Sequence, residues 1–182
     1  NIFCNYINDN TDKQDKKSYQ TILSLWFSKD NPFVFGKQYQ FKNINFRYTT
    51  LFCCAYDVKF DRCGFDAVNI IGKKRVTVLE CNMKDTVFID FSSVSFFAGN
   101  LKRSAIISNN LISISFEVTA LSDVEIIVNH HLLNLIIDTD TINDVRIYTY
   151  SISWLGISYF LQDSPHSKLS IHYVSKISEK RI

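Results

Sequence analysis

A continuous stretch of alternating side chains, residues 36–60, constrains the fold more than any other part of the sequence. It reads GKQYQFKNINFRYTTLFCCAYDVKF and contains two extended runs back to back. One face of the second run is formed by Phe52, Cys54, Tyr56, Val58 and Phe60. Alternation with a period of two over this length is typical of strands that bury one face. We therefore expect the chain to be mainly β.

Length and composition are compatible with one packed domain. The chain has 182 residues, of which 46% are hydrophobic and 21% charged, so it can fill a core. Residues 1–17 are mostly polar and are expected to be a tail or linker. Residues 18–182 are expected to form a single β-rich domain. The net charge of +2 is low for a protein that depends on phosphate contacts, so any nucleic-acid role requires a local basic patch.

Turn and periodicity signals divide the rest of the chain into short elements. Residues 18–27 have apolar side chains at helical spacing, and residues 72–74 and 109–110 are expected to be hairpin turns. Residues 122–137 are ambiguous. Ser122 and Glu125 form a capping-box pattern, whereas the β-branched residues that follow favour a strand. We favour a helix over at least residues 130–137.

This pattern of elements predicts many strands joined by short turns. About nine strands and two or three short helices are expected, and no repeat of 20–50 residues is evident. The predicted fold is an OB-like antiparallel barrel, closed or partly open, with short flanking helices. A β-sandwich is the alternative.

Sequence motifs give little support for catalysis or for metal binding. The nucleophile-elbow, phosphate-loop, dinucleotide-binding and zinc-protease motifs are all missing from the sequence, so we expect no enzyme activity and no cofactor. Cys81 and His131 are a candidate Cys–His pair, but nothing in the sequence brings them together. We expect no metal site, although two sets of ligand-type residues are candidates. These are Cys54, Cys63 and Cys81 with a histidine for zinc, and Asp138, Asp140, Asn143 and Asp144 for calcium.

Cations interleaved with aromatic side chains suggest where nucleic acid would bind. On a strand surface, aromatic rings stack on bases and cations neutralise phosphates. The same residues are also compatible with an ordinary core edged by a solvated rim. The candidate nucleic-acid-binding residues are Lys42, Tyr48, Lys73, Lys74, Arg75, Arg146 and Tyr148.

Residues 26–47 resemble the opening of an oligonucleotide/oligosaccharide-binding (OB) domain. In single-strand-binding proteins of the replication protein A type, a pattern of the form G-x-x-Y-x-F/I-x-x-I/L marks the first barrel strand. Here it is matched by Gly36, Tyr39, Phe41 and Ile44. The chain is also similar in length to OB domains of telomere-maintenance assemblies, the CST complex and telomerase-associated subunits. The resemblance covers about half the chain, and its motif is short.

The resemblance implies a non-enzymatic scaffold in a telomere or replication maintenance complex. Its expected partners are other protein subunits, with single-stranded DNA as a further candidate and no membrane. The odd number of cysteines, five, and the absence of glycosylation sequons favour an intracellular location, and the resemblance implies the nucleus. The alternative is a β-sandwich protein of a large DNA virus that binds a host protein.

Overall fold

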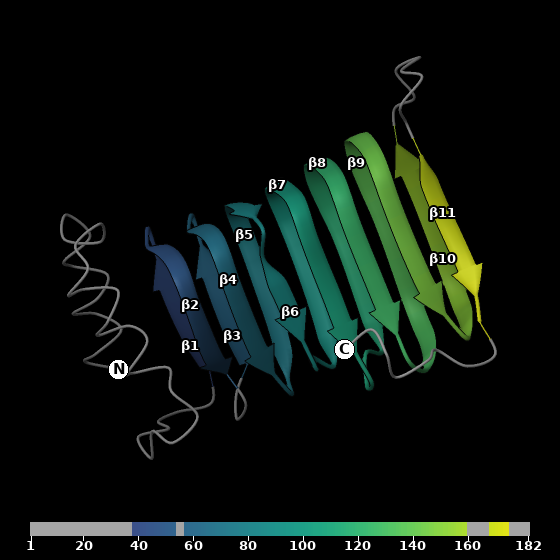
Figure 1. Cartoon of the computed structure of the whole chain (residues 1–182), viewed down its shortest axis with the longest axis horizontal. Coiled ribbons are helices and arrows are strands. Elements are labelled where there is room, and N and C mark those ends of the chain that lie inside the picture. The colour runs from purple at the N-terminus through teal and green to yellow at the C-terminus, as the bar shows by residue number, and fades with distance from the viewer. Residues whose placement is uncertain (1–37, 54–56, 160–167, 175–182) are drawn as a thin grey trace.

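The computed structural model describes residues 38–53, 57–159 and 168–174. These residues form one winding sheet whose strands follow one another along the long axis of the molecule (Figure 1). The strands are β1 (Gln38–Lys42), β2 (Asn45–Cys53), β3 (Asp57–Asp61), β4 (Gly64–Gly72), β5 (Arg75–Lys84), β6 (Val87–Ile89), β7 (Ser93–Ser108), β8 (Ser113–Val128), β9 (His131–Thr149), β10 (Ser151–Tyr159) and β11 (Leu169–Tyr173).

Every described strand pairing is parallel, which makes the molecule a β-solenoid. One turn of the solenoid is here called a coil. It brings the chain back to the same lateral position after roughly 20 residues, as in Gly64↔Asn82 and Ser113↔Asn134. The described residues form six coils and part of a seventh. These coils begin at Gln38, Asp57, Arg75, Ser93, Ser113, Asn134 and Trp154.

Each coil has three extended segments, and these stack into three faces. In the second coil the segments are 57–61, 64–66 and 68–72, and they lie on the first, second and third face respectively. Residues with positive φ turn the chain between the faces. The corner between the second and third faces is a column of such residues, formed by Tyr48, Ala67, Asp85, Arg103, Asp123 and Asp144. The long strands β7, β8 and β9 continue through these corners.

The core consists of inward-pointing side chains that stack from coil to coil. On the first face, one buried column contains Phe41, Phe60, Val78, Phe96, Phe116 and Ile137. The rings of Phe96 and Phe116 stack with centroids 5.1 Å apart. The second face stacks Phe46 on Phe65 at 5.2 Å. Buried side chains pack on their register partners in the neighbouring coils. Contacts between adjacent coils therefore contribute much of the stability of the solenoid.

The expectation of a mainly β chain is confirmed, but the OB-like antiparallel barrel is wrong, and so is the β-sandwich. Both alternatives require antiparallel pairs, whereas all described pairs are parallel. The predicted hairpins at 72–74 and 109–110 are instead turns that lead from the end of one coil to the start of the next. The strand that follows each turn pairs in parallel with strands of neighbouring coils. A strand buries one face in either arrangement, so the alternation of side chains does not reveal the direction of the neighbouring strand.

The helix favoured over residues 130–137 is also wrong, because β8 and β9 occupy the ambiguous segment 122–137. Val124 and Ile126 point into the core, and Ile147 stacks on Ile126 in the next coil. The β-branched residues therefore outweigh the capping-box pattern. The predicted helix at 18–27 and the polar segment 1–17 lie outside the described residues.

Candidate binding surfaces

The predicted nucleic-acid-binding residues do not form one surface. Lys42 ends β1, and its Nζ lies 3.8 Å from Oδ2 of Asp61. Tyr48 lies at a corner of the first coil, with 80% of its surface exposed. Lys73 and Lys74 lie between β4 and β5, Arg75 begins β5, and all three are exposed.

The other two predicted residues, Arg146 and Tyr148, lie on the third face of the sixth coil. Arg146 forms an ion pair with Asp144 (Nη2–Oδ2, 2.8 Å), and this hydrogen bond raises the pKa of Arg146. Tyr148 stacks on His172. Thr50, which lies two residues after the predicted Tyr48, belongs to the same register column as Arg146. Five register steps separate these two residues. At about 4.8 Å per step, this is roughly 24 Å. The seven predicted residues are thus spread over separate coils, and the described residues do not form the OB fold that suggested a telomere role.

The candidate zinc ligands Cys63 and Cys81 form a buried thiol pair instead. The backbone N–H of Cys63 donates a hydrogen bond to Sγ of Cys81 at 3.2 Å. Burial, together with a hydrogen bond to Cys81, raises the pKa of the Cys63 thiol. Cys54 lies outside the described residues. Within the described ranges, no group of three or more histidine, cysteine, aspartate or glutamate residues is placed to hold a metal ion.

The candidate Cys–His pair is not brought together either. Cys81 is buried in β5, in the third coil, whereas His131 begins β9 at the end of the fifth coil. The ring of His131 instead forms a hydrogen bond with the hydroxyl of Ser151 through Nδ1. The two side chains therefore cannot act as a nucleophile and its base.

The acidic segment proposed for calcium binding is part of β9 and not a loop. Asp138 is exposed on the first face. Asp144 lies at the corner before the third face, where its carboxylate binds Arg146. The carboxylates are therefore spread along an extended strand and do not converge on one point.

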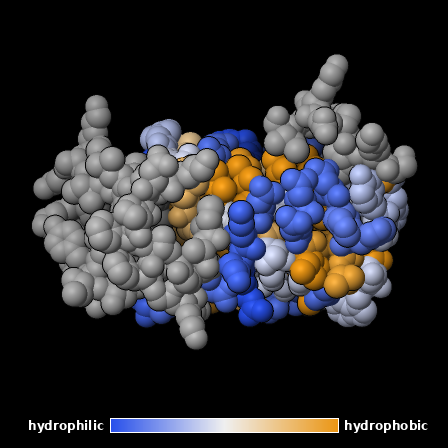
Figure 2. All heavy atoms as spheres, turned by 90° about the horizontal axis from the view of Figure 1, so that it is seen from below, coloured by the Kyte–Doolittle hydropathy of each residue, from blue (hydrophilic) through white to orange (hydrophobic). Residues whose placement is uncertain are grey.

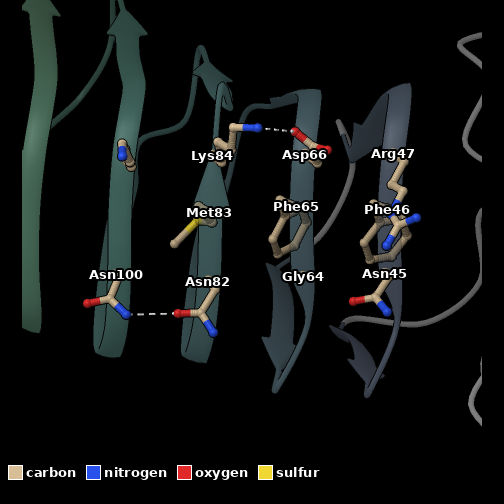
Figure 3. Close-up of a pocket in the computed structure, with 11 residues that line it drawn as sticks. Asn45, Phe46, Arg47, Gly64, Phe65, Asp66, Asn82, Met83, Lys84 and Asn100 are labelled. Atoms are coloured by element: carbon tan, nitrogen blue, oxygen red, sulfur yellow. Dashed lines mark hydrogen bonds and ion pairs between the residues drawn. The ribbon is translucent and has the colours of Figure 1, made fainter.

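A depression of about 370 Å³ lies on the second face, across the first four coils (Figure 3). One side is an amide row, defined as the register column Asn45, Gly64, Asn82 and Asn100. The Nδ2 of Asn100 donates a hydrogen bond to Oδ1 of Asn82 at 2.9 Å. Gly64 adds no side chain to the row, and the Asn45 amide lies over its backbone, where a β-carbon would collide with Oδ1 of Asn45.

The opposite side of the depression is a charged row, the register column Arg47, Asp66, Lys84 and Lys102. Figure 3 shows Arg47, Asp66 and Lys84 on this side and the asparagines on the other. Nζ of Lys84 lies 3.6 Å from Asp66 and 3.9 Å from Asp85. The floor between the two rows belongs to Phe46, Phe65 and Met83, each at most 3% exposed. Three cations and one carboxylate give the depression a positive balance.

A second surface, here called the Trp154 surface, is formed by Ile112, Leu133 and Trp154. Their side chains are 51%, 53% and 55% exposed. Ile112 and Leu133 end successive coils, and the N–H of Leu133 donates to the carbonyl of Ile112 at 2.9 Å. The indole of Trp154 lies over Gly156, where an added β-carbon would be 2.7 Å from Cη2. The indole is thus held against the outside of β10, because Gly156 presents no side chain beneath it.

Two carboxylates lie on the first face as well. Glu117 and Asp138 are register partners in neighbouring coils, and both are exposed. Like charges directly opposite one another on a sheet are unfavourable, so a cation near both would be stabilising.

Among the described residues visible in a space-filling view from below, hydrophobic areas are interrupted by hydrophilic ones (Figure 2).

The sequence interpretation missed both surfaces. Asn82 and Asn100 are register partners in successive coils, so a search for a period of one coil would have found them. Trp154 and Gly156, spaced two apart, share one strand face.

Among the described residues, no helix combines the length and the apolar character needed to cross a membrane. No protein-family model, curated protein or solved structure matches the chain significantly.

Proposed function

We propose that the chain is a non-enzymatic scaffold that binds another protein through the Trp154 surface. The observation that carries the proposal is the exposed indole of Trp154, which is held over Gly156, and Trp154 is the register partner of Asn134, the residue after exposed Leu133. Tryptophan is enriched among the residues that dominate binding energy in protein interfaces. A rigid parallel sheet holds these side chains in place before binding, so little conformational entropy is lost when a partner docks.

The charge on this face indicates the chemistry of the partner. Glu117 and Asp138 lie side by side on the first face, the face from which the Trp154 indole also projects. A partner that places a lysine or arginine between these carboxylates would relieve their repulsion. The proposed partner therefore presents an apolar side chain to Trp154 and Leu133, and a cation to Glu117 and Asp138.

The test is proximity labelling in the native host, followed by reconstitution with the purified candidate partner. Titration calorimetry would then compare the original chain with Trp154→Ala and with Glu117→Gln/Asp138→Asn. Loss of an interface tryptophan is expected to weaken binding by about 2 kcal/mol or more, a factor near thirty. The charge-neutralised double variant is expected to bind more weakly and with a smaller dependence on salt.

Tyr48→Ala is the matched control, because Tyr48 is an exposed aromatic residue in the first coil, at the other end of the solenoid. It is expected to bind the partner as the original chain does. The proposal fails if Trp154→Ala, with an unchanged circular dichroism spectrum, binds every reconstituted partner as tightly as Tyr48→Ala does.

A further inference from the structure

We infer that the depression on the second face binds a linear β-1,4-linked glycan that contains uronic-acid units, with the glycan running along the solenoid axis. The inference does not depend on the Trp154 surface, which shares no residue with the depression. It is based on the spacing of the two rows, the order of charges within them and the missing side chain at Gly64.

The spacing of the rows fits a pyranose chain. Successive coils are about 4.8 Å apart, and an extended β-1,4-linked chain advances by a similar distance per sugar. The amide row and the charged row occupy positions two residues apart on each strand, roughly 6.7 Å. A pyranose ring lying between them directs its C2 and C3 hydroxyls to one row and its C5 substituent to the other.

The order of the charges fits the alternation of such a chain. Successive sugars in an extended β-1,4-linked chain face opposite ways, so their carboxylates point alternately to the two sides. The charged row begins with a cation, a carboxylate and a cation, in the order Arg47, Asp66 and Lys84. Arg47 and Lys84 would bind sugar carboxylates, and Asp66 would accept hydrogen bonds from the hydroxyls of the sugar between them.

The amide row provides the complementary positions. Asn45 and Asn82 lie opposite the two cations, where each amide can bind a pair of sugar hydroxyls. Gly64 lies opposite Asp66 and adds no side chain, and the Asn45 carboxamide leans over its backbone, so the carboxylate of the reversed sugar would lie above this carboxamide and beside Asn82. The Oδ1 of Asn82 accepts from Asn100, and its Nδ2 group has hydrogens that it can donate to that carboxylate.

The probe is a hexasaccharide of β-1,4-linked mannuronate, titrated against the whole chain by calorimetry. The comparison ligands are β-1,4-linked mannohexaose, which has the same linkage without carboxylates, and a single-stranded hexanucleotide. The acidic hexasaccharide is expected to bind at least tenfold more tightly than either. Lys102, in the fourth coil, lies where the alternation places sugar hydroxyls, so its loss is expected to have a smaller effect. Lys84→Gln is expected to weaken binding by about tenfold, the usual effect of losing one charge-assisted hydrogen bond.

Asn100→Asp tests the amide row without a change in volume, because it places a negative charge beside Asn82. It is expected to weaken binding of the acidic hexasaccharide by tenfold or more. Lys73→Gln is the control, since it removes an exposed cation from a different corner. It is expected to bind as the original chain does, and Trp154→Ala likewise.

Three results would overturn the inference. The first is no binding of the acidic hexasaccharide at millimolar concentration. The second is equal binding of mannohexaose or of the hexanucleotide, which would indicate either charge-independent sugar binding or a non-specific cationic surface. The third is equal weakening by Lys73→Gln and Lys84→Gln. Thermal unfolding of each variant separates loss of binding from loss of the fold.

Discussion

Arg103 holds Asp85 from the neighbouring coil through two hydrogen bonds, of 2.7 Å from Nε and 2.8 Å from Nη2. Both residues have positive φ and occupy the same corner column. The Arg103 guanidinium lowers the pKa of the Asp85 carboxyl below its usual value. The pair therefore links two coils at a point where the backbone adopts an unfavourable conformation.

Because the pKa of Asp85 is lowered in the folded chain, the pair stabilises the fold most above the ordinary carboxyl pKa, about 3.9. This contribution is lost as pH falls through the lowered pKa. Arg103→Gln is expected to lower the thermal midpoint slightly at pH 7, since both partners are exposed. The difference from the original chain should shrink below pH 4. A difference that is unchanged between pH 7 and pH 2.5 would mean that ionisation of Asp85 is not involved.

Gly99→Ala is expected to be strongly destabilising. Gly99 has φ of +92°, and a β-carbon there would collide with the backbone carbonyl of Cys81. Left-handed backbone alone costs an L-residue about 1–2 kcal/mol, and the collision with a backbone atom cannot be relieved by rotating a side chain. Urea unfolding of the variant measures the loss. A decrease under about 0.5 kcal/mol, the usual range of a surface substitution, would contradict the tight packing at this corner.

Gly72→Ala tests a collision of a different kind, because the added β-carbon would meet the ring of Phe91. Overpacking of this kind typically costs about 1–3 kcal/mol. A second change, Phe91→Leu, shortens the obstructing side chain. The double variant is expected to lose less stability than the two single variants together, and a double-mutant cycle measures this coupling. Strict additivity would show that the ring of Phe91 does not limit the space at Gly72.

Phe116→Ala is expected to destabilise the solenoid by about 3–5 kcal/mol, because it removes a fully buried ring that stacks on Phe96. Glu117→Ala, on the same strand but facing outward, is the control and should stay within about 0.5 kcal/mol. Denaturant unfolding gives both values. If the two variants were equally stable, the assignment of inward and outward faces on β8 would be wrong.

The Cys63 thiol is expected to resist alkylation in the folded chain. Burial raises its pKa, so the reactive thiolate is scarce at pH 8. Pulse labelling with iodoacetamide, read by peptide mass spectrometry, should modify Cys63 only after unfolding in urea. Rapid labelling of Cys63 without denaturant would show that this part of the core opens readily.

The repeat that defines this fold is present in the sequence but irregular. The interval between successive members changes along the buried column Phe41, Phe60, Val78, Phe96, Phe116 and Ile137. Its members also vary between phenylalanine, valine and isoleucine, because any apolar side chain of suitable volume fills the layer. The early intervals are shorter than the usual range of repeat lengths, so a search over that range passes over them. The variation in side-chain type hides the later, longer intervals.

The corners were equally hard to predict. Positive φ is usually associated with glycine or asparagine, yet the corner residues include Tyr48, Ala67 and Arg103. The candidate surfaces depend on the same geometry. No feature of the sequence around Asn82 or Asn100 indicates that these two residues pair. Only the register between coils brings their amides together.

The sequence by itself determined that the chain forms strands and, along most of them, which side chains face the core. Both properties are local, since alternation and β-branched residues act over neighbouring positions. Only the tertiary structure decided that the strands run parallel and wind into coils. That choice depends on left-handed corners and on contacts between positions one coil apart, and these contacts exist only once the chain has closed each coil.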